Sequence, residues 1–145
     1  MAELRALSGR EASIFACLTE TVVAPGNGLP PVRETDAVRF FDDWLVLLPR
    51  PNRVAMRALL WAAELGPLAT GFRRRLRQLD GARRSEFLRG LERAPRRQLR
   101  VIAKLMESTS QLAYYGDDAV LALLGYDPEA NLERGRRLRA SEGRP

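Results

Sequence analysis

The chain has 145 residues, of which 46% are hydrophobic and 29% charged, and it carries a net charge of +6. This balance fits one globular domain with its own core and excludes a disordered chain. The absence of histidine and the single cysteine, Cys17, argue against histidine-activated nucleophiles, histidine metal or haem sites and an intramolecular disulfide. We therefore expect no catalytic residue, no metal site and no cofactor in this chain.

The sequence contains no run near the roughly 18 consecutive apolar residues that a membrane-spanning helix needs. Residues 1–13 hold neither an apolar signal core nor paired arginines. These features predict a cytoplasmic protein that does not bind a membrane.

The first helix is predicted to begin at Gly9, because Ser8 and Glu11 have the spacing of a capping box. Cys17 falls inside it as a small buried residue. Prolines and glycines in residues 24–31 end this helix and form a loop. The apolar residues that recur at helical spacing are Ile14, Phe15, Leu18 and Val22.

The next two helices are predicted on either side of residue 49. Residues 35–48 carry apolar side chains on two adjoining faces, which indicates a helix central to the core. Pro51 suits the first turn of the following helix, and Gly66 suits the residue after its end. The predicted buried stripe of that third helix is Val54, Ala58, Trp61, Ala62 and Leu65.

Three further helices are predicted between residues 67 and 115. A short one covers residues 67–79, although Gly71 weakens it. Asp80 caps the next, and Pro95 separates that helix from a long one that runs towards Tyr114. No stretch alternates apolar and polar residues as a strand would.

These elements predict an all-α fold, a single compact bundle of about six to seven helices over residues 7–128 that ends in a short C-terminal helix. Residues 129–145 lack aromatic and β-branched side chains. This composition predicts an irregular basic tail that is solvated or becomes ordered on a partner.

Residues 65–104 contain twelve basic and three acidic side chains, a local net charge of +9. The favoured interpretation of this positive charge is that the basic side chains lie on helix faces exposed to solvent. The second interpretation is that they bind an acidic protein partner. Nucleic acid is the least favoured, because the segment lacks interleaved aromatics and a recognisable recognition helix. We call these basic residues the arginine belt: Arg73, Arg74, Arg75, Arg77, Arg83, Arg84, Arg89, Arg93, Arg96, Arg97, Arg100 and Lys104.

Two pairs of adjacent carboxylates occur, Asp42 with Asp43 and Asp117 with Asp118. Neighbours on a helix point about 100° apart, so neither pair is suited to share a proton or a metal ion. Both pairs are expected to be structural, with Asp117 acting as a helix cap.

Residues 113–128 predict two helix ends in series. Gly116 would end the long helix in a left-handed turn, Asp117 would cap a short helix over residues 118–124, and Gly125 would end that helix. Tyrosines at such a corner are expected to bury their rings and keep their hydroxyls at the surface, as is common in interfaces. The predicted partner-binding residues are Tyr114, Tyr115, Asp117, Gly125, Tyr126, Asp127 and Pro128.

The stretch AYYGDDAVLALLGYD resembles the C-terminal signature of the gluconate 2-dehydrogenase subunit 3 family. In that family a Tyr-Tyr pair is followed by Ser/Thr-Asp-Pro and then by Gly-Tyr; Asp118 stands here where the family usually has proline. The stretches LSGREASIFACLTETVVAP and LDGARRSEFLRGLER are loosely similar to the family's opening and middle helices.

The resemblance implies a small helical subunit without catalytic residues. It implies a partner, a large FAD-containing oxidoreductase of the glucose-methanol-choline type, which the small subunit binds, stabilises or matures. No small-molecule substrate of its own is implied. Two alternatives remain open from the residues themselves: a nucleic-acid-associated helical protein that uses the arginine belt, and a helical scaffold that self-associates through the tyrosine corner.

Overall fold

The computed structural model describes residues 3–26 and 28–141, and within these residues the chain is helical with no β-strand, which confirms the predicted all-α bundle. The α-helices and short 3-10 helices (η) are α1 (Gly9–Val23), η1 (Val32–Glu34), α2 (Ala37–Leu47), α3 (Arg50–Ala69), η2 (Leu76–Gln78), α4 (Gly81–Glu92), α5 (Arg97–Tyr115), α6 (Asp118–Leu123) and α7 (Pro128–Ser141).

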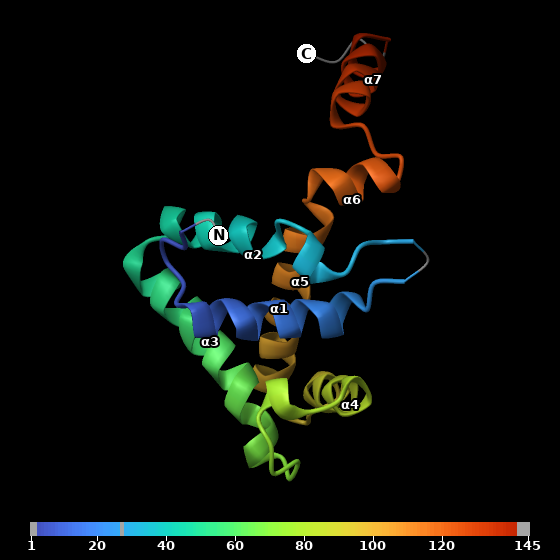
Figure 1. The fold of residues 1–145 in the computed structure, drawn as a ribbon. Helices are drawn as coiled ribbons and strands as arrows, with labels where there is room; N and C mark the ends of the chain where they lie inside the picture. Colours follow the sequence, from blue (N-terminus) through green and yellow to red (C-terminus); the bar gives the residue numbers. More distant parts are fainter. Residues whose placement is uncertain (1–2, 27, 142–145) are drawn as a thin grey trace.

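Helices α1 to α5 form a compact body, and α6 and α7 extend from one end of it (Figure 1). Helix α1 crosses the middle of the body and packs against α5, which crosses behind it in this view. Helix α2 lies along the upper edge of the body, α3 runs down one side, and α4 lies at the lower end. We call residues 9–115 the body and residues 116–141 the arm.

Helix α1 begins where the capping box predicts. Ser8 Oγ accepts a hydrogen bond from the Glu11 amide at 3.3 Å, and a Glu11 carboxylate oxygen accepts one from the Ser8 amide at 2.9 Å. Phe15 is buried and stacks on Phe41 of α2, with ring centroids 4.0 Å apart. This pair lies in the core that α5 closes from behind.

Helix α2 buries one of its two predicted apolar faces. Phe41 and Leu45 are in the core, whereas Phe40 is partly exposed and Leu47 is 82% exposed. The helix therefore lies at the edge of the body and not at its centre.

Helix α3 continues to Ala69, so the predicted end at Gly66 is wrong. A Cβ atom at residue 66 would lie 2.7 Å from the ring of Phe87, so the glycine permits close packing of α3 on α4. The predicted stripe is also displaced, because Val54 and Leu65 are exposed. The buried residues of α3 are Leu60, Ala63, Glu64 and Pro67.

The short helix predicted over residues 67–79 is not formed as such. The last turn of α3 covers residues 67–69, and only the 3-10 turn η2 follows it. Gly71 (φ 91°) and Arg73 (φ 56°) adopt left-handed backbone conformations that interrupt a right-handed helix.

Helices α4 and α5 follow the sequence prediction. Asp80 caps α4 by accepting a hydrogen bond from the Arg83 amide at 2.9 Å, and α5 begins after Pro95. Helix α5 buries Ala103, Met106 and Ala113 against the body.

The prediction of an irregular basic tail is wrong, because residues 128–141 form α7. Asp127 accepts hydrogen bonds from the amides of Glu129 and Ala130 at 2.9 and 3.1 Å, and Pro128 occupies the first helical position. Glu133 and Arg137 add an exposed ion pair along the helix. Residues 142–145 of the predicted tail lie outside the described residues.

Candidate partner-binding site

Tyr114 is a core residue and not a surface residue. It is fully buried at the end of α5, and its hydroxyl donates a hydrogen bond to the carbonyl oxygen of Pro30 at 2.6 Å. Burial raises the pKa of this phenol. The expectation that every tyrosine of the corner keeps its hydroxyl at the surface is therefore wrong for Tyr114, which fastens the 24–31 loop to α5.

Tyr115 and Tyr126 are the tyrosines that reach the surface. Tyr115 is 38% exposed and packs edge-on against the ring of Tyr114, with centroids 5.2 Å apart. Tyr126 is 51% exposed and follows α6 in the arm. The two rings thus belong to different elements, the last turn of α5 and the link between α6 and α7.

Asp117 joins the arm to the body. One carboxylate oxygen accepts hydrogen bonds from the amides of Ala119 and Val120 at 2.9 and 3.1 Å, which caps α6 as predicted. The other oxygen accepts the amide of Asp36 at 2.8 Å, just before α2. Gly116 is right-handed, with φ −83°, so the predicted left-handed turn there is wrong; α5 ends because Asp117 adopts an extended backbone.

The remaining predicted site residues shape the link between α6 and α7. Gly125 has φ +68°, the left-handed conformation expected after a helix end. Asp127 and Pro128 start α7. These residues therefore form the turn between α6 and α7.

The arm exposes large apolar side chains along its whole length. A shallow hollow between the two helices is lined by Leu121, Gly125, Tyr126 and Pro128, and a second one by Tyr126, Leu132 and Gly135. Sequence analysis missed the leucines of α7 because it treated this segment as an irregular tail. We call the following residues the arm surface: Leu123, Leu124, Tyr126, Leu132 and Leu138.

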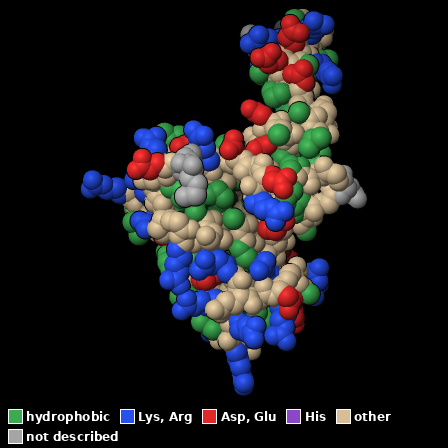
Figure 2. Space-filling view, viewed as in Figure 1, with side chains coloured by type: hydrophobic (Ala, Val, Ile, Leu, Met, Phe, Trp, Pro, Cys, Tyr) green, Lys and Arg blue, Asp and Glu red, His purple; other side chains and the backbone are tan. Residues whose placement is uncertain are grey.

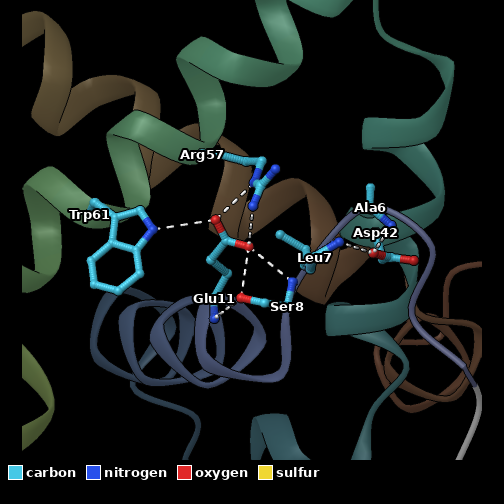
Figure 3. A network of polar contacts seen from close by, with 7 residues as sticks. All are labelled: Ala6, Leu7, Ser8, Glu11, Asp42, Arg57 and Trp61. Carbon is cyan, nitrogen blue, oxygen red and sulfur yellow. Dashed lines mark hydrogen bonds and ion pairs between the residues drawn. The ribbon is translucent and has the colours of Figure 1, made fainter.

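A buried carboxylate in α1 organises a polar cluster in the body (Figure 3). Glu11 accepts hydrogen bonds from Arg57 at 2.8 and 3.1 Å, from the indole of Trp61 at 3.3 Å and from Ser8. Burial acts to raise the pKa of Glu11, but the hydrogen bonds from Arg57 and Ser8 outweigh it and hold the pKa at about 2. Glu11 is therefore charged at neutral pH and joins α1 to α3.

Asp42 holds the segment before α1 in place (Figure 3). Its carboxylate is buried and accepts hydrogen bonds from the amides of Arg5, Ala6 and Leu7 at 2.8, 3.0 and 2.8 Å. Burial acts to raise the pKa of Asp42, and the three amides outweigh it and lower the pKa. This geometry agrees with the structural role predicted for the Asp42 and Asp43 pair.

A third buried carboxylate, Glu64 of α3, pairs with Arg77 at 3.1 Å. Glu11, Asp42 and Glu64 all accept hydrogen bonds from donors within the chain, so each is accounted for as a structural group. Sequence analysis did not single out Glu64, and no local signal marked it, because the predicted apolar stripe of this helix runs through other residues.

The arginine belt gathers at the lower end of the body, where α3 ends and α4 lies, and few acidic side chains interrupt it in this view (Figure 2). Three of its arginines are engaged by the body: Arg77 pairs with Glu64, and Arg84 and Arg100 donate to backbone carbonyls. The exposed members include Arg73, Arg74, Arg83, Arg89, Arg93, Arg96 and Arg97.

Within residues 3–26 and 28–141, no group of three histidine, cysteine or acidic side chains lies close enough to hold a metal ion. Cys17 is half-buried in α1, and burial raises the pKa of its thiol. No helix in the described part of the chain is long and apolar enough to cross a membrane.

Comparison with known proteins gives no match: no family model, no curated protein and no solved structure aligns significantly with this chain. The resemblance of residues 113–127 to the gluconate 2-dehydrogenase subunit 3 family therefore stays a prediction.

Proposed function

We propose that this chain is a non-catalytic accessory subunit that binds and stabilises a large FAD-dependent oxidoreductase of the glucose-methanol-choline type in the cytoplasm. The observation that carries the proposal is the arm: a capped helix of 14 residues, α7, on which no residue is buried. An isolated helix of this length is marginal in water and gains most of its stability by packing. A partner that covers the arm surface would supply that packing.

The chemistry of the arm surface fits a protein partner. Leucines and a tyrosine dominate it, and aromatic and large apolar residues carry much of the binding energy in protein interfaces. The sequence resemblance to the small-subunit family falls on the same corner, residues 113–127, and that resemblance names the class of partner. FAD would belong to the large subunit.

The test is capture of a defined flavoprotein. The chain is tagged and co-expressed with candidate flavoproteins of the glucose-methanol-choline type from its source organism, and the eluate is examined by absorbance spectroscopy and mass spectrometry. We expect a yellow flavin spectrum and a second, larger polypeptide. Elution of the bare, colourless chain in every such co-expression would contradict the proposal.

Matched variants locate the contact. Tyr126→Ala and Leu132→Ala truncate the arm surface and should abolish or strongly reduce the captured flavin. Leu47→Ala, on α2, removes a side chain that is 82% exposed but lies on the body, and it should leave capture unchanged. Equal capture by all three variants would mean that the arm is not the docking surface.

The exposed arginines favour nucleic acid as a second candidate. Each phosphate contact adds close to one unit to the slope of log affinity against log salt concentration. Duplex and single-stranded binding measured over a salt series would reveal a steep slope if the arginine belt binds phosphates. Flat or absent binding removes this candidate.

A further inference from the structure

The outer face of α5 carries an apolar stripe that lies apart from the arm surface. Helix α5 turns Ala103, Met106 and Ala113 towards the core. Its opposite side exposes Val101 (48%), Leu105 (46%), Leu112 (56%) and Tyr115 (38%), with the small Ser108 between the two leucines. We call these five residues the α5 stripe.

The spacing of the α5 stripe is that of a helix face that packs against a second helix. Its positions follow one another at intervals of four, three, four and three residues, which keeps them on one side of a helix and is the pattern of paired helices. The stripe extends about 21 Å along the helix at 1.5 Å per residue. It contains no charged side chain, and its members stay exposed to solvent in the single chain.

The stripe is close to symmetric about Ser108. One leucine lies three residues before the serine and the other four residues after it, and Val101 and Tyr115 each lie seven residues away. A two-fold interface uses the same patch on both copies, so the patch must be self-complementary. An antiparallel crossing at Ser108 places Val101 near the partner's Tyr115 and Leu105 near the partner's Leu112, with the small serine at the closest approach.

The charges at the two ends of α5 select the antiparallel arrangement. Arg96 and Arg97 of the arginine belt lie exposed at the start of α5, and Arg97 is one turn before Val101 on the same side. Asp118 lies exposed just beyond the other end. Antiparallel pairing brings these opposite charges together and opposes the helix dipoles favourably, whereas parallel pairing would set one arginine belt beside the other.

We propose that two copies of this chain associate antiparallel through the α5 stripe, crossing near Ser108, with Arg97 of each copy facing Asp118 of the other. This interface uses Asp118 at the start of the arm but leaves the arm surface, Leu123 to Leu138, uncovered. It therefore goes beyond the proposed function and does not depend on it, because it needs no flavoprotein and uses α5 and not α7.

Sedimentation velocity of the purified full chain over a concentration series tests the proposal. We expect a species of twice the chain mass of 16.3 kDa. Leu112→Glu should abolish the dimer, and Leu47→Glu, which adds the same charge at a more exposed leucine of α2, should retain it. A wild-type chain that stays monomeric throughout, or a Leu112→Glu chain that stays dimeric, overturns the proposal.

A charge-reversal cycle tests the direction of pairing. Arg97→Glu and Asp118→Arg should each weaken the dimer about tenfold, since each change turns two attractive contacts into repulsive ones. The double variant should restore most of the wild-type affinity. Single variants without effect, or a double variant weaker than either single one, would overturn the antiparallel arrangement.

Cross-linking tests the crossing point without disturbing the stripe. Ser108→Cys in a Cys17→Ser background, treated with a short bis-maleimide, should give a covalent dimer, whereas Leu47→Cys in the same background should not. Failure of Ser108→Cys to cross-link while the chain is dimeric by sedimentation overturns the proposed crossing. This measurement also decides the matter if Leu112→Glu does not fold.

Discussion

Each of the five helices of the body buries side chains against another element, whereas α7 in the arm buries none. Both regions use the same local devices, since Ser8 caps α1 in the body and Asp127 provides the hydrogen bonds that start α7. Local sequence signals are thus enough to start a helix in either region. Only tertiary contacts, or a partner, decide whether that helix contributes to stability.

The largest expected contrast comes from removing one apolar side chain in each region. Phe41→Ala should cost about 4 kcal/mol of unfolding free energy, because it opens a cavity beside Phe15 in the core. Leu132→Ala in the arm should change it by less than about 0.5 kcal/mol. Urea denaturation followed by circular dichroism measures both. A comparable cost for the two variants would show that the arm packs on the body in solution.

The next contrast separates buried from exposed carboxylates. Glu11→Ala should cost about 2–3 kcal/mol, because Arg57, Trp61 and Ser8 lose their common acceptor while Arg57 keeps partial access to water. Glu34→Ala removes an exposed partner of Arg33 and should cost less than about 0.5 kcal/mol. Chemical denaturation measures the unfolding free energy of both variants. Equal losses would argue that the Glu11 cluster does not stabilise the fold.

The pH dependence of stability should belong to the body. Glu11 has a folded pKa of about 2 against its usual 4.5, and the pKa of Asp42 is also lowered. Because unfolding raises these pKa values, the stabilisation is complete above about pH 4.5 and is lost as the pH falls towards 2. We expect Glu11 alone to account for about 2–3 kcal/mol of this loss.

Urea midpoints at neutral pH and at about pH 3 measure this loss. The Glu11→Gln variant has no titratable group at residue 11. Its unfolding free energy at neutral pH should be lower than that of the wild-type chain, and it should fall less steeply as the pH is lowered. A variant that declines as steeply as the wild-type chain would assign the acid sensitivity to other carboxylates.

A smaller effect is expected at the tyrosines. Tyr114→Phe should cost about 1 kcal/mol, because the carbonyl of Pro30 loses its donor in a partly buried site. Tyr126→Phe alters an exposed ring in the arm and should be neutral for stability. Thermal unfolding of the two variants shows whether Tyr114, unlike Tyr126, is a structural residue.

Removal of α7 should have the smallest effect on the stability of the body, although it removes the most residues. Removing residues 126–145 should change the unfolding free energy of the body by less than about 0.5 kcal/mol, since no residue of α7 is buried. The same deletion should abolish flavoprotein capture. A markedly destabilised body would mean that α7 supports the fold, and unchanged capture would assign docking to another surface.

The helix starts could be predicted because their signals are local. The capping residues Ser8, Asp80 and Asp117 all act within three residues of themselves, and each contact is formed as expected. The same signal is present in Asp127, Pro128 and Glu129, but the lack of aromatic and β-branched side chains after Pro128 predicted an irregular tail in place of α7.

The errors arose where distant contacts decide the structure. Gly66 has the residue type of a helix end, but its role depends on the ring of Phe87, 21 positions further along the chain. The buried face of α3 includes Glu64, an acid that apolar periodicity assigns to solvent, because Arg77 pairs with it. Neither contact is visible in a local pattern.

The candidate site was predicted only in part for the same reason. The sequence located the corner at residues 114–128 and the caps that shape it. It could not separate Tyr114 from Tyr115, because the buried position of Tyr114 depends on Pro30, which lies 84 residues earlier. The exposed leucines of α7 became recognisable as a surface only once that segment was seen as a helix.

The hydrogen bond between Tyr114 and Pro30 also has a consequence during synthesis. It joins the loop after α1 to the last helix of the body, and α1 itself packs against α5. A ribosome must therefore release α5 before the apolar face of α1, with Ile14, Phe15 and Leu18, can be covered. Folding therefore depends on a contact between residues that lie 84 positions apart in the sequence, and such non-local contacts form more slowly than local ones.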